Sequence, residues 1–121
     1  DEAQAEQFWI GIREQTDPFF RSATPLWRLS VKSTTPPLKL AGGQVIEWGG
    51  ALRWLKSDAD AKTMRNAAAA ANGHATLFRA SDKSAGVFQP LAPALLKIHR
   101  HLKQTFDPAG IFNRGRLYPE F

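Results

Sequence analysis

The chain has 121 residues, a net charge of +5, 43% hydrophobic residues and 22% charged residues, which fits one small domain with a single core. It has no cysteine, which excludes a disulfide framework, a thiolate metal site and a cysteine nucleophile. No apolar run reaches the roughly 18 residues that a membrane helix requires. The basic charge is compatible with a nucleic acid, an acidic partner or a phosphate-bearing cofactor.

The first half of the sequence predicts one helix followed by three strands. Apolar side chains at helical spacing predict a helix from Ala3 to Glu14. Alternating apolar and polar residues predict a strand from Leu26 to Lys32. Two more strands are expected at 44–48 and 51–56, because Gly49-Gly50 supplies a two-residue hairpin turn between them.

The second half predicts a helix over 59–71 that begins at an N-cap in Ser57-Asp58 and ends at Gly73 as the C′ residue, followed by a strand from His74 to Arg79. A last helix is expected over 91–106. Its apolar side chains fall on a single stripe formed by Leu91, Leu95, Ile98, Leu102 and Phe106. The order of elements predicts an α+β fold, an antiparallel sheet with helices packed on one face.

A dense run of turn residues follows the last helix. Asp107-Pro108 predicts the end of the helix, Gly110 a reversed turn, and the run Asn113-Arg114-Gly115 a second turn. This pattern is typical either of a tail fixed against another surface or of a helix cap followed by a frayed end.

Three segments resemble a known protein family. The terminal segment FDPAGIFNRGRLYPEF resembles the C-terminal signature D-P-x-G-I-x-N-P-G-K/R of FAD-linked oxidases of the vanillyl-alcohol oxidase type. The segments IEWGGALRWLK (46–56) and GHAT (73–76) are similar to the FAD-binding (E) subunits of bacterial glycolate oxidases. The similarity runs from Gln7 to the last residue. One position departs from the signature, because Arg114 stands where the family has proline.

The resemblance implies that residues 1–121 are a single C-terminal cap-domain fragment of a longer FAD-linked subunit, with a truncated ferredoxin-like sheet. The tail, residues 107–121, is then expected to return to a flavin domain outside this sequence. The positions that match the signature, Asn113, Gly115 and Arg116, are the residues implied to contact FAD. The isolated chain is expected to be inactive and not to hold FAD by itself.

The implied activity is an FAD-dependent oxidation of a 2-hydroxy acid, glycolate to glyoxylate, by hydride transfer to the flavin. The implied partners are the other flavin and iron–sulfur subunits of the oxidase. The implied location is the cytoplasm, with any membrane association through partner subunits and no membrane span of its own. The truncated sheet also predicts a homodimer, because an unpaired sheet edge favours pairing with a second copy.

Candidate substrate residues are His74, at the start of a predicted strand, and the arginines Arg53 and Arg79. No metal site is expected. His99 and His101 are two positions apart on a helix and therefore point to different faces. The segment around His74 also lacks the glutamate–histidine pair that related flavin dehydrogenases use to hold a metal.

Glu47 and Arg53 are expected to form an ion pair across the predicted hairpin. Two other functions remain open at this stage. One is a stand-alone ferredoxin-like module that binds a small anion or a protein partner. The other is a basic nucleic-acid-binding domain, which the even spread of basic residues from Arg13 to Arg116 does not favour.

Overall fold

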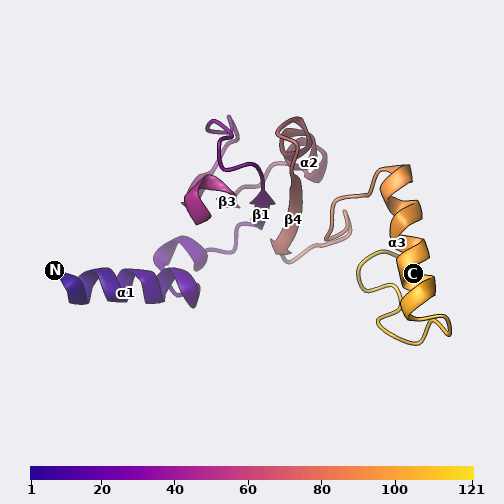
Figure 1. Cartoon of the computed structure of the whole chain (residues 1–121). Helices are drawn as coiled ribbons and strands as arrows, with labels where there is room; N and C mark the ends of the chain where they lie inside the picture. The colour runs from indigo at the N-terminus through magenta and orange to yellow at the C-terminus, as the bar shows by residue number, and fades with distance from the viewer. The chain divides into compact units, whose positions relative to one another are not determined.

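A four-stranded antiparallel sheet forms the centre of the first part of the chain (Figure 1). Its strands are β1 (Leu26–Ser30), β2 (Gly43–Glu47), β3 (Leu52–Lys56) and β4 (His74–Arg79), in the order β2-β3-β1-β4. The computed structural model describes all 121 residues and divides into two compact units, residues 1–87 and 88–121. The sheet and its helices confirm the predicted α+β class.

Three α-helices accompany the sheet: α1 (Glu2–Arg13), α2 (Ala61–Ala70) and α3 (Pro93–Phe106). None of them has the length and apolar character that crossing a membrane would require. The predicted N-cap of α2 in Ser57-Asp58 is wrong, because the cap is Asp60, whose carboxylate accepts hydrogen bonds from the backbone and hydroxyl of Thr63 at 2.9 and 2.7 Å.

The C-terminal end of α2 corrects the predicted role of Gly73. The left-handed C′ residue is Asn72, with φ of 54°, and Gly73 follows it. The Gly73 amide donates to the carbonyl of Ala68 at 2.8 Å and the Asn72 amide to that of Ala69 at 2.9 Å, which is a Schellman motif. Glycine is required at position 73 for space, since an added Cβ would lie 2.1 Å from the carbonyl oxygen of Ser30.

One face of the sheet packs against α2. The buried side chains of this core are Trp27, Leu29, Leu55, Met64, Ala68, Ala75 and Leu77. Because successive strand residues point to opposite faces, the neighbours of these residues in β1, β3 and β4 face away from α2.

The opposite face is only partly covered. There the end of α1 contributes Ile12, and the short 3₁₀ helix η1 (Pro18–Phe20) contributes Phe20; both pack with Leu26, Leu52 and Trp54. Most of α1 is exposed, including Phe8, Trp9 and Ile10. Towards the C-terminal end of β1 no helix covers this face, and the side chains there are polar.

The β2–β3 connection is longer than predicted. It is a four-residue loop, since Glu47 pairs with Leu52 and the 3₁₀ helix η2 (Trp48–Gly50) lies between them. The predicted ion pair between Glu47 and Arg53 is wrong. Arg53 pairs with Ile46, so Glu47 and Arg53 point to opposite faces of the sheet.

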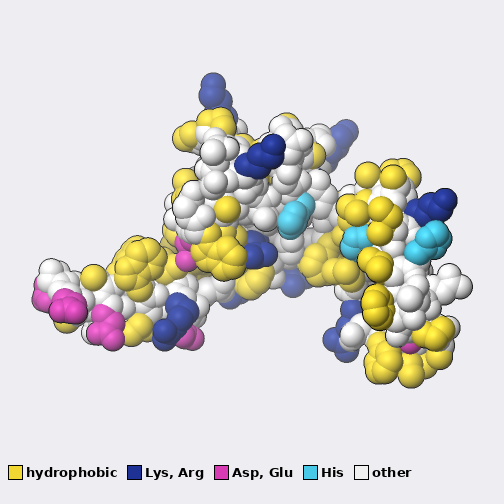
Figure 2. Space-filling view, in the orientation of Figure 1, with side chains coloured by type: hydrophobic (Ala, Val, Ile, Leu, Met, Phe, Trp, Pro, Cys, Tyr) yellow, Lys and Arg dark blue, Asp and Glu magenta, His cyan; other side chains and the backbone are white.

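In the second unit, the tail folds back on its own helix. The Tyr118 hydroxyl donates to the carbonyl of Gln89 at 3.2 Å, and the rings of His99 and Phe121 lie 6.4 and 5.6 Å from the Tyr118 ring. The predicted apolar stripe of α3 is exposed. Its exposed fractions are 44% for Leu95, 55% for Ile98, 50% for Leu102 and 80% for Phe106. Figure 2 shows apolar side chains on the surfaces of α1 and α3.

Candidate functional site

Four polar side chains gather on the sheet face that α2 does not cover. Arg28 and Ser30 belong to β1, and their antiparallel partners on β4 are Thr76 and His74. Residues directly opposite in neighbouring strands have Cβ atoms about 5 Å apart. These four residues are therefore neighbours, and we call them the open-face cluster.

The open-face cluster suits a small carboxylate that carries a hydroxyl group. Arg28 is half-buried, and no ion pair of the structure involves it. Its guanidinium has the fork geometry that binds a carboxylate with two parallel hydrogen bonds. The hydroxyls of Ser30 and Thr76 both donate and accept hydrogen bonds, and the neutral imidazole of His74 offers one donor and one acceptor nitrogen.

The structure brings only one of the predicted substrate residues, His74, into this cluster. Arg53 is buried on the other face, where its guanidinium donates to the carbonyl oxygens of Gly50 at 3.2 Å, Pro36 at 2.8 Å and Thr35. Arg79 donates to the Gln15 side chain at 2.6 Å and to the Phe20 carbonyl at 3.4 Å. Both arginines therefore hold loops, and a role in substrate binding remains a prediction for all three residues.

Arg28 is the residue that the sequence reasoning missed. The alternation within β1 already placed Arg28 and Ser30 on one face. The pattern does not reveal that β4 lies beside β1, and this neighbour is what completes the cluster with His74 and Thr76.

The C-terminal turn is built around the carboxylate of Asp107. It accepts the backbone amides of Ile111 and Phe112, each at 3.0 Å, and the ammonium of Lys103 at 2.5 Å. The hydrogen bond from Lys103 is the main cause that lowers the pKa of Asp107 to about 2. The D-P-x-G-I part of the signature thus has a structural explanation: its aspartate ties the turn to the helix.

The predicted flavin-contacting residues follow this turn and are all exposed. Asn113 and Gly115 have left-handed backbones, with φ of 49° and 64°, and the amide of Arg116 donates to the Asn113 carbonyl at 3.2 Å. Gly115 lines a hollow of about 330 Å³ in this unit. Arg114, which replaces the proline of the signature, donates to the carbonyls of Gly110 and Ala109 and so fastens the turn by hydrogen bonds.

No three histidine, aspartate or glutamate side chains lie together in a group that would hold a metal ion. His99 instead lies beside the rings of Tyr118 and Phe121, at centroid distances of 6.4 and 6.3 Å.

Comparison with known proteins gives one match. Over 119 residues, which are 98% of this chain, the sequence is 50% identical to glycolate oxidase subunit GlcE of Escherichia coli (strain K12). The chain is similar to the C-terminal part of GlcE. This confirms the resemblance that the two sequence segments and the terminal signature indicated.

The match to GlcE covers only 33% of that subunit, so the chain spans about a third of the relative's length. No protein-family model matches the chain. No solved structure matches it either.

Proposed function

We propose that this chain is the C-terminal cap part of the FAD-binding subunit of a glycolate oxidase, which oxidises glycolate to glyoxylate. The observation that carries the proposal is the 50% identity to glycolate oxidase subunit GlcE over nearly the whole chain. The word subunit in that name supports an assembly of several chains. The partners we propose are further flavin and iron–sulfur subunits, which pass the electrons on.

The open-face cluster is the part of this chain that we assign to substrate. Arg28 binds the glycolate carboxylate, and the hydroxyls of Ser30 and Thr76 orient the molecule. His74 accepts the proton of the substrate hydroxyl as the carbon–hydrogen bond breaks. A bound flavin, contacted by Asn113, Gly115 and Arg116, would supply the acceptor for the hydride that leaves the same carbon. Loss of one proton and one hydride converts glycolate to glyoxylate.

The C-terminal tail is the part that we assign to the flavin. Asn113 and Gly115 are exposed and have left-handed backbones, and an added Cβ at Gly115 would meet no atom within 4 Å. A planar ring can therefore approach the backbone closely there. Asn113 and Arg116 would then offer hydrogen-bond donors to the polar edge of the ring.

The exposed apolar residues of the second unit support a return of the tail, residues 107–121, to a flavin domain. Ile111 and Phe112 are 67% and 62% exposed, close in sequence to the stripe of α3. Exposed large apolar side chains that gather in this way normally mark an interface. We infer that the flavin domain of the longer subunit covers it.

The experiment uses the full-length gene product, purified with its partner subunits. We expect a flavin absorption band that bleaches when glycolate is added under nitrogen. A colourless product would contradict the proposal. It would favour a stand-alone module, for which the unpaired Arg28 would be an anion-binding residue. A flavin band that glycolate does not bleach would contradict glycolate as the substrate and would still support FAD as the cofactor.

A further inference from the structure

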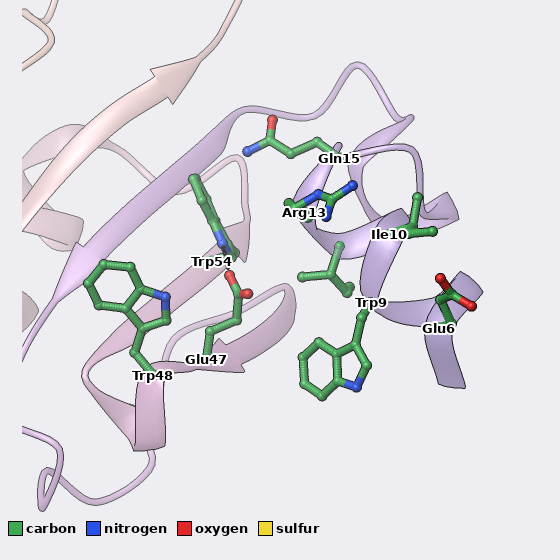
Figure 3. A pocket seen from close by; sticks show the side chains of 9 residues that line it. Glu6, Trp9, Ile10, Arg13, Gln15, Glu47, Trp48 and Trp54 are labelled. Carbon is green, nitrogen blue, oxygen red and sulfur yellow. Dashed lines mark hydrogen bonds between the residues drawn. The ribbon is translucent and has the colours of Figure 1, made fainter. Parts of the chain in front are cut away.

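A second hollow lies beside the open-face cluster on the same sheet face, between α1 and the β2–β3 hairpin, because its lining residue Trp54 pairs with Arg28 of the cluster. Its volume is about 690 Å³, and three indoles and two carboxylates line it (Figure 3). The indoles come from three elements: Trp9 from α1, Trp48 from η2 and Trp54 from β3. The carboxylates are Glu6 and Glu47. Neither the open-face cluster nor the C-terminal turn contributes to it.

The Glu47 carboxylate is held in place at the floor of this hollow. One of its oxygens accepts a hydrogen bond from the indole nitrogen of Trp54 at 2.6 Å. Trp54 is itself fixed by edge contacts with Phe20 and Phe78, at centroid distances of 5.9 and 4.9 Å. In Figure 3 the Glu47 side chain lies between the side chains of Trp48 and Trp9. A fixed carboxylate between aromatic rings is an arrangement that receives a cation.

The charge of the hollow is negative, although the chain carries +5. Arg13 is the cation among its lining residues, and its guanidinium is already paired with Glu14 at 2.7 Å. The Gln15 side chain accepts from Arg79 at 2.6 Å, so that guanidinium is engaged as well. Arg28 lies across from Trp54 on β1 but is not among the lining residues. Within the lining, Glu6 and Glu47 outnumber Arg13 and leave a surplus of negative charge that a partner cation would match.

Trp48 adds an observation that packing within this chain does not explain. Its side chain is 75% exposed, and its backbone is left-handed with φ of 49°. A left-handed backbone is unfavourable for a bulky residue, and strain of this kind gathers at functional sites. Trp9 faces the same hollow and is 60% exposed. The two exposed indoles form an apolar rim around the carboxylates.

We propose that this hollow binds an arginine side chain presented by a partner polypeptide. A guanidinium stacks on an indole and donates two hydrogen bonds to a carboxylate, so one group satisfies both features of the hollow. A polypeptide, rather than a free small cation, would also cover the exposed indoles, the lining residue Ile10 and its exposed neighbour Phe8 on α1. Tryptophan and arginine are the residues that dominate binding energy at protein interfaces. The proposal does not depend on the flavin.

The first test measures cation binding in the full-length subunit labelled with 5-fluorotryptophan. The probe is N-acetylarginine amide, and the control is the uncharged N-acetylcitrulline amide of nearly the same shape. We expect the fluorine signals of Trp9 and Trp48 to shift on titration with the arginine compound, and binding of the citrulline compound to be about tenfold weaker. Trp27, buried on the α2 face, serves as an internal control whose signal stays in place.

Two variants separate binding from folding. Glu47→Gln keeps an acceptor for the Trp54 indole and removes the charge, so binding of the arginine compound is expected to weaken about tenfold. Trp48→Asn removes the indole and introduces a residue that tolerates the left-handed backbone. Binding of the arginine compound is expected to weaken by a similar factor. The matched control is Glu2→Gln, an exposed glutamate of α1 outside the hollow. Equal binding by Glu47→Gln and the unchanged protein would overturn the proposal.

The second test identifies the occupant in the assembled complex. A photo-crosslinking benzoylphenylalanine replaces Trp48, and the crosslinked peptides are sequenced. A crosslink to an arginine-containing segment of another subunit is the expected result. A crosslink to another part of the same polypeptide, or none above the level given by the same residue placed at Lys39, would overturn the proposal.

Discussion

Asp107 shows at the scale of one residue how a sequence signature becomes a structure. Its pKa is lowered from the ordinary value of 3.8 to about 2 by the hydrogen bond from Lys103, with further contributions from the amides of Phe112 and Ile111. Because the folded pKa is depressed, the stabilisation of the turn is fully present above the ordinary pKa of an aspartate. It is lost as the pH falls through about 2.

We therefore expect the amide hydrogens of Ile111 and Phe112 to lose protection between about pH 4 and pH 2, as nuclear magnetic resonance on the chain would show. In the Asp107→Asn variant the charge-assisted contact with Lys103 is absent at every pH. Its turn should be looser at pH 7 and should show no such acid transition. If the acid transition persists in this variant, the loss of protection comes from another carboxylate and not from Asp107.

Arg28 carries the prediction that tests the open-face cluster. Replacing Arg28 by glutamine removes the charge that we assign to the glycolate carboxylate. Because hydrogen bonds to charged groups contribute about 1.5–3 kcal/mol, we expect KM for glycolate to rise about 10- to 100-fold in the complete oxidase. The control is Lys32→Gln, an exposed cation just beyond β1. Equal KM values for the two variants would exclude Arg28 from the site while leaving the flavin assignment intact.

At the scale of elements, the α2–β4 connection packs closely against the end of β1, which leaves no room for a side chain at position 73. An alanine Cβ at position 73 would lie 2.1 Å from the Ser30 carbonyl oxygen and 2.8 Å from the Val31 side chain. Gly73→Ala is therefore expected to destabilise the chain by about 3 kcal/mol, near the upper end for overpacking. Gly49→Ala is the control. No atom lies within 4 Å of its added Cβ, so only the unfavourable left-handed backbone lowers the free energy of unfolding, by about 1 kcal/mol.

Urea unfolding of the two glycine variants checks this prediction. Equal destabilisation by Gly73→Ala and Gly49→Ala would mean that the connection at position 73 shifts to make room.

Helices and strands could be predicted where residues close in sequence determine them. They could not be predicted where contacts between distant segments determine them. The predicted strand His74–Arg79 matches the observed one. Its start could be predicted because the turn at Asn72-Gly73 comes directly before it. The start of α2 was missed because Ser57, Asp58 and Asp60 are all residues that cap helices, and only the fold selects one.

The candidate site shows the same limit. His74 stood out in the sequence because of its place at a strand start. Arg28 did not, because its importance comes from the position of β1 between β3 and β4, which is a tertiary fact. Arg53 was weighed as a substrate residue because sequence gives the charge of an arginine and not its hydrogen-bond partners. The carbonyls of Gly50, Pro36 and Thr35 occupy its donors in the fold.

At the scale of the whole molecule, each of the two units exposes an apolar helix surface. On α1 it is formed by Phe8, Trp9 and Ile10, and on α3 by the stripe that ends at Phe106. Both helices have the amphipathic pattern that the sequence predicted, but only Ile12 of α1 is buried within this chain. This is what a part of a larger assembly would show, and it agrees with a match that spans 33% of GlcE.

The free edge of the sheet leads to the last prediction, which concerns the isolated chain. The two outer strands are β2 and β4. The edge of β4 already makes one backbone hydrogen bond outside the sheet, because the amide of Leu77 donates to the carbonyl of Val87 at 2.9 Å. The edge of β2 has no neighbouring strand and carries Ile46, which is 53% exposed. An unpaired edge with an exposed apolar side chain is a template for pairing with a second copy.

We expect the isolated chain to form a dimer through β2, measured by sedimentation velocity, and Ile46→Lys to make it monomeric, because a lysine on an edge strand opposes pairing. Ile98→Lys is the matched control on α3, where the side chain is 55% exposed, and it should leave the dimer intact. The reverse pattern, a monomer only with Ile98→Lys, would place self-association on the helix stripe. The dimer would then use the surface that we assign to the flavin domain, and it should disappear in the full-length subunit.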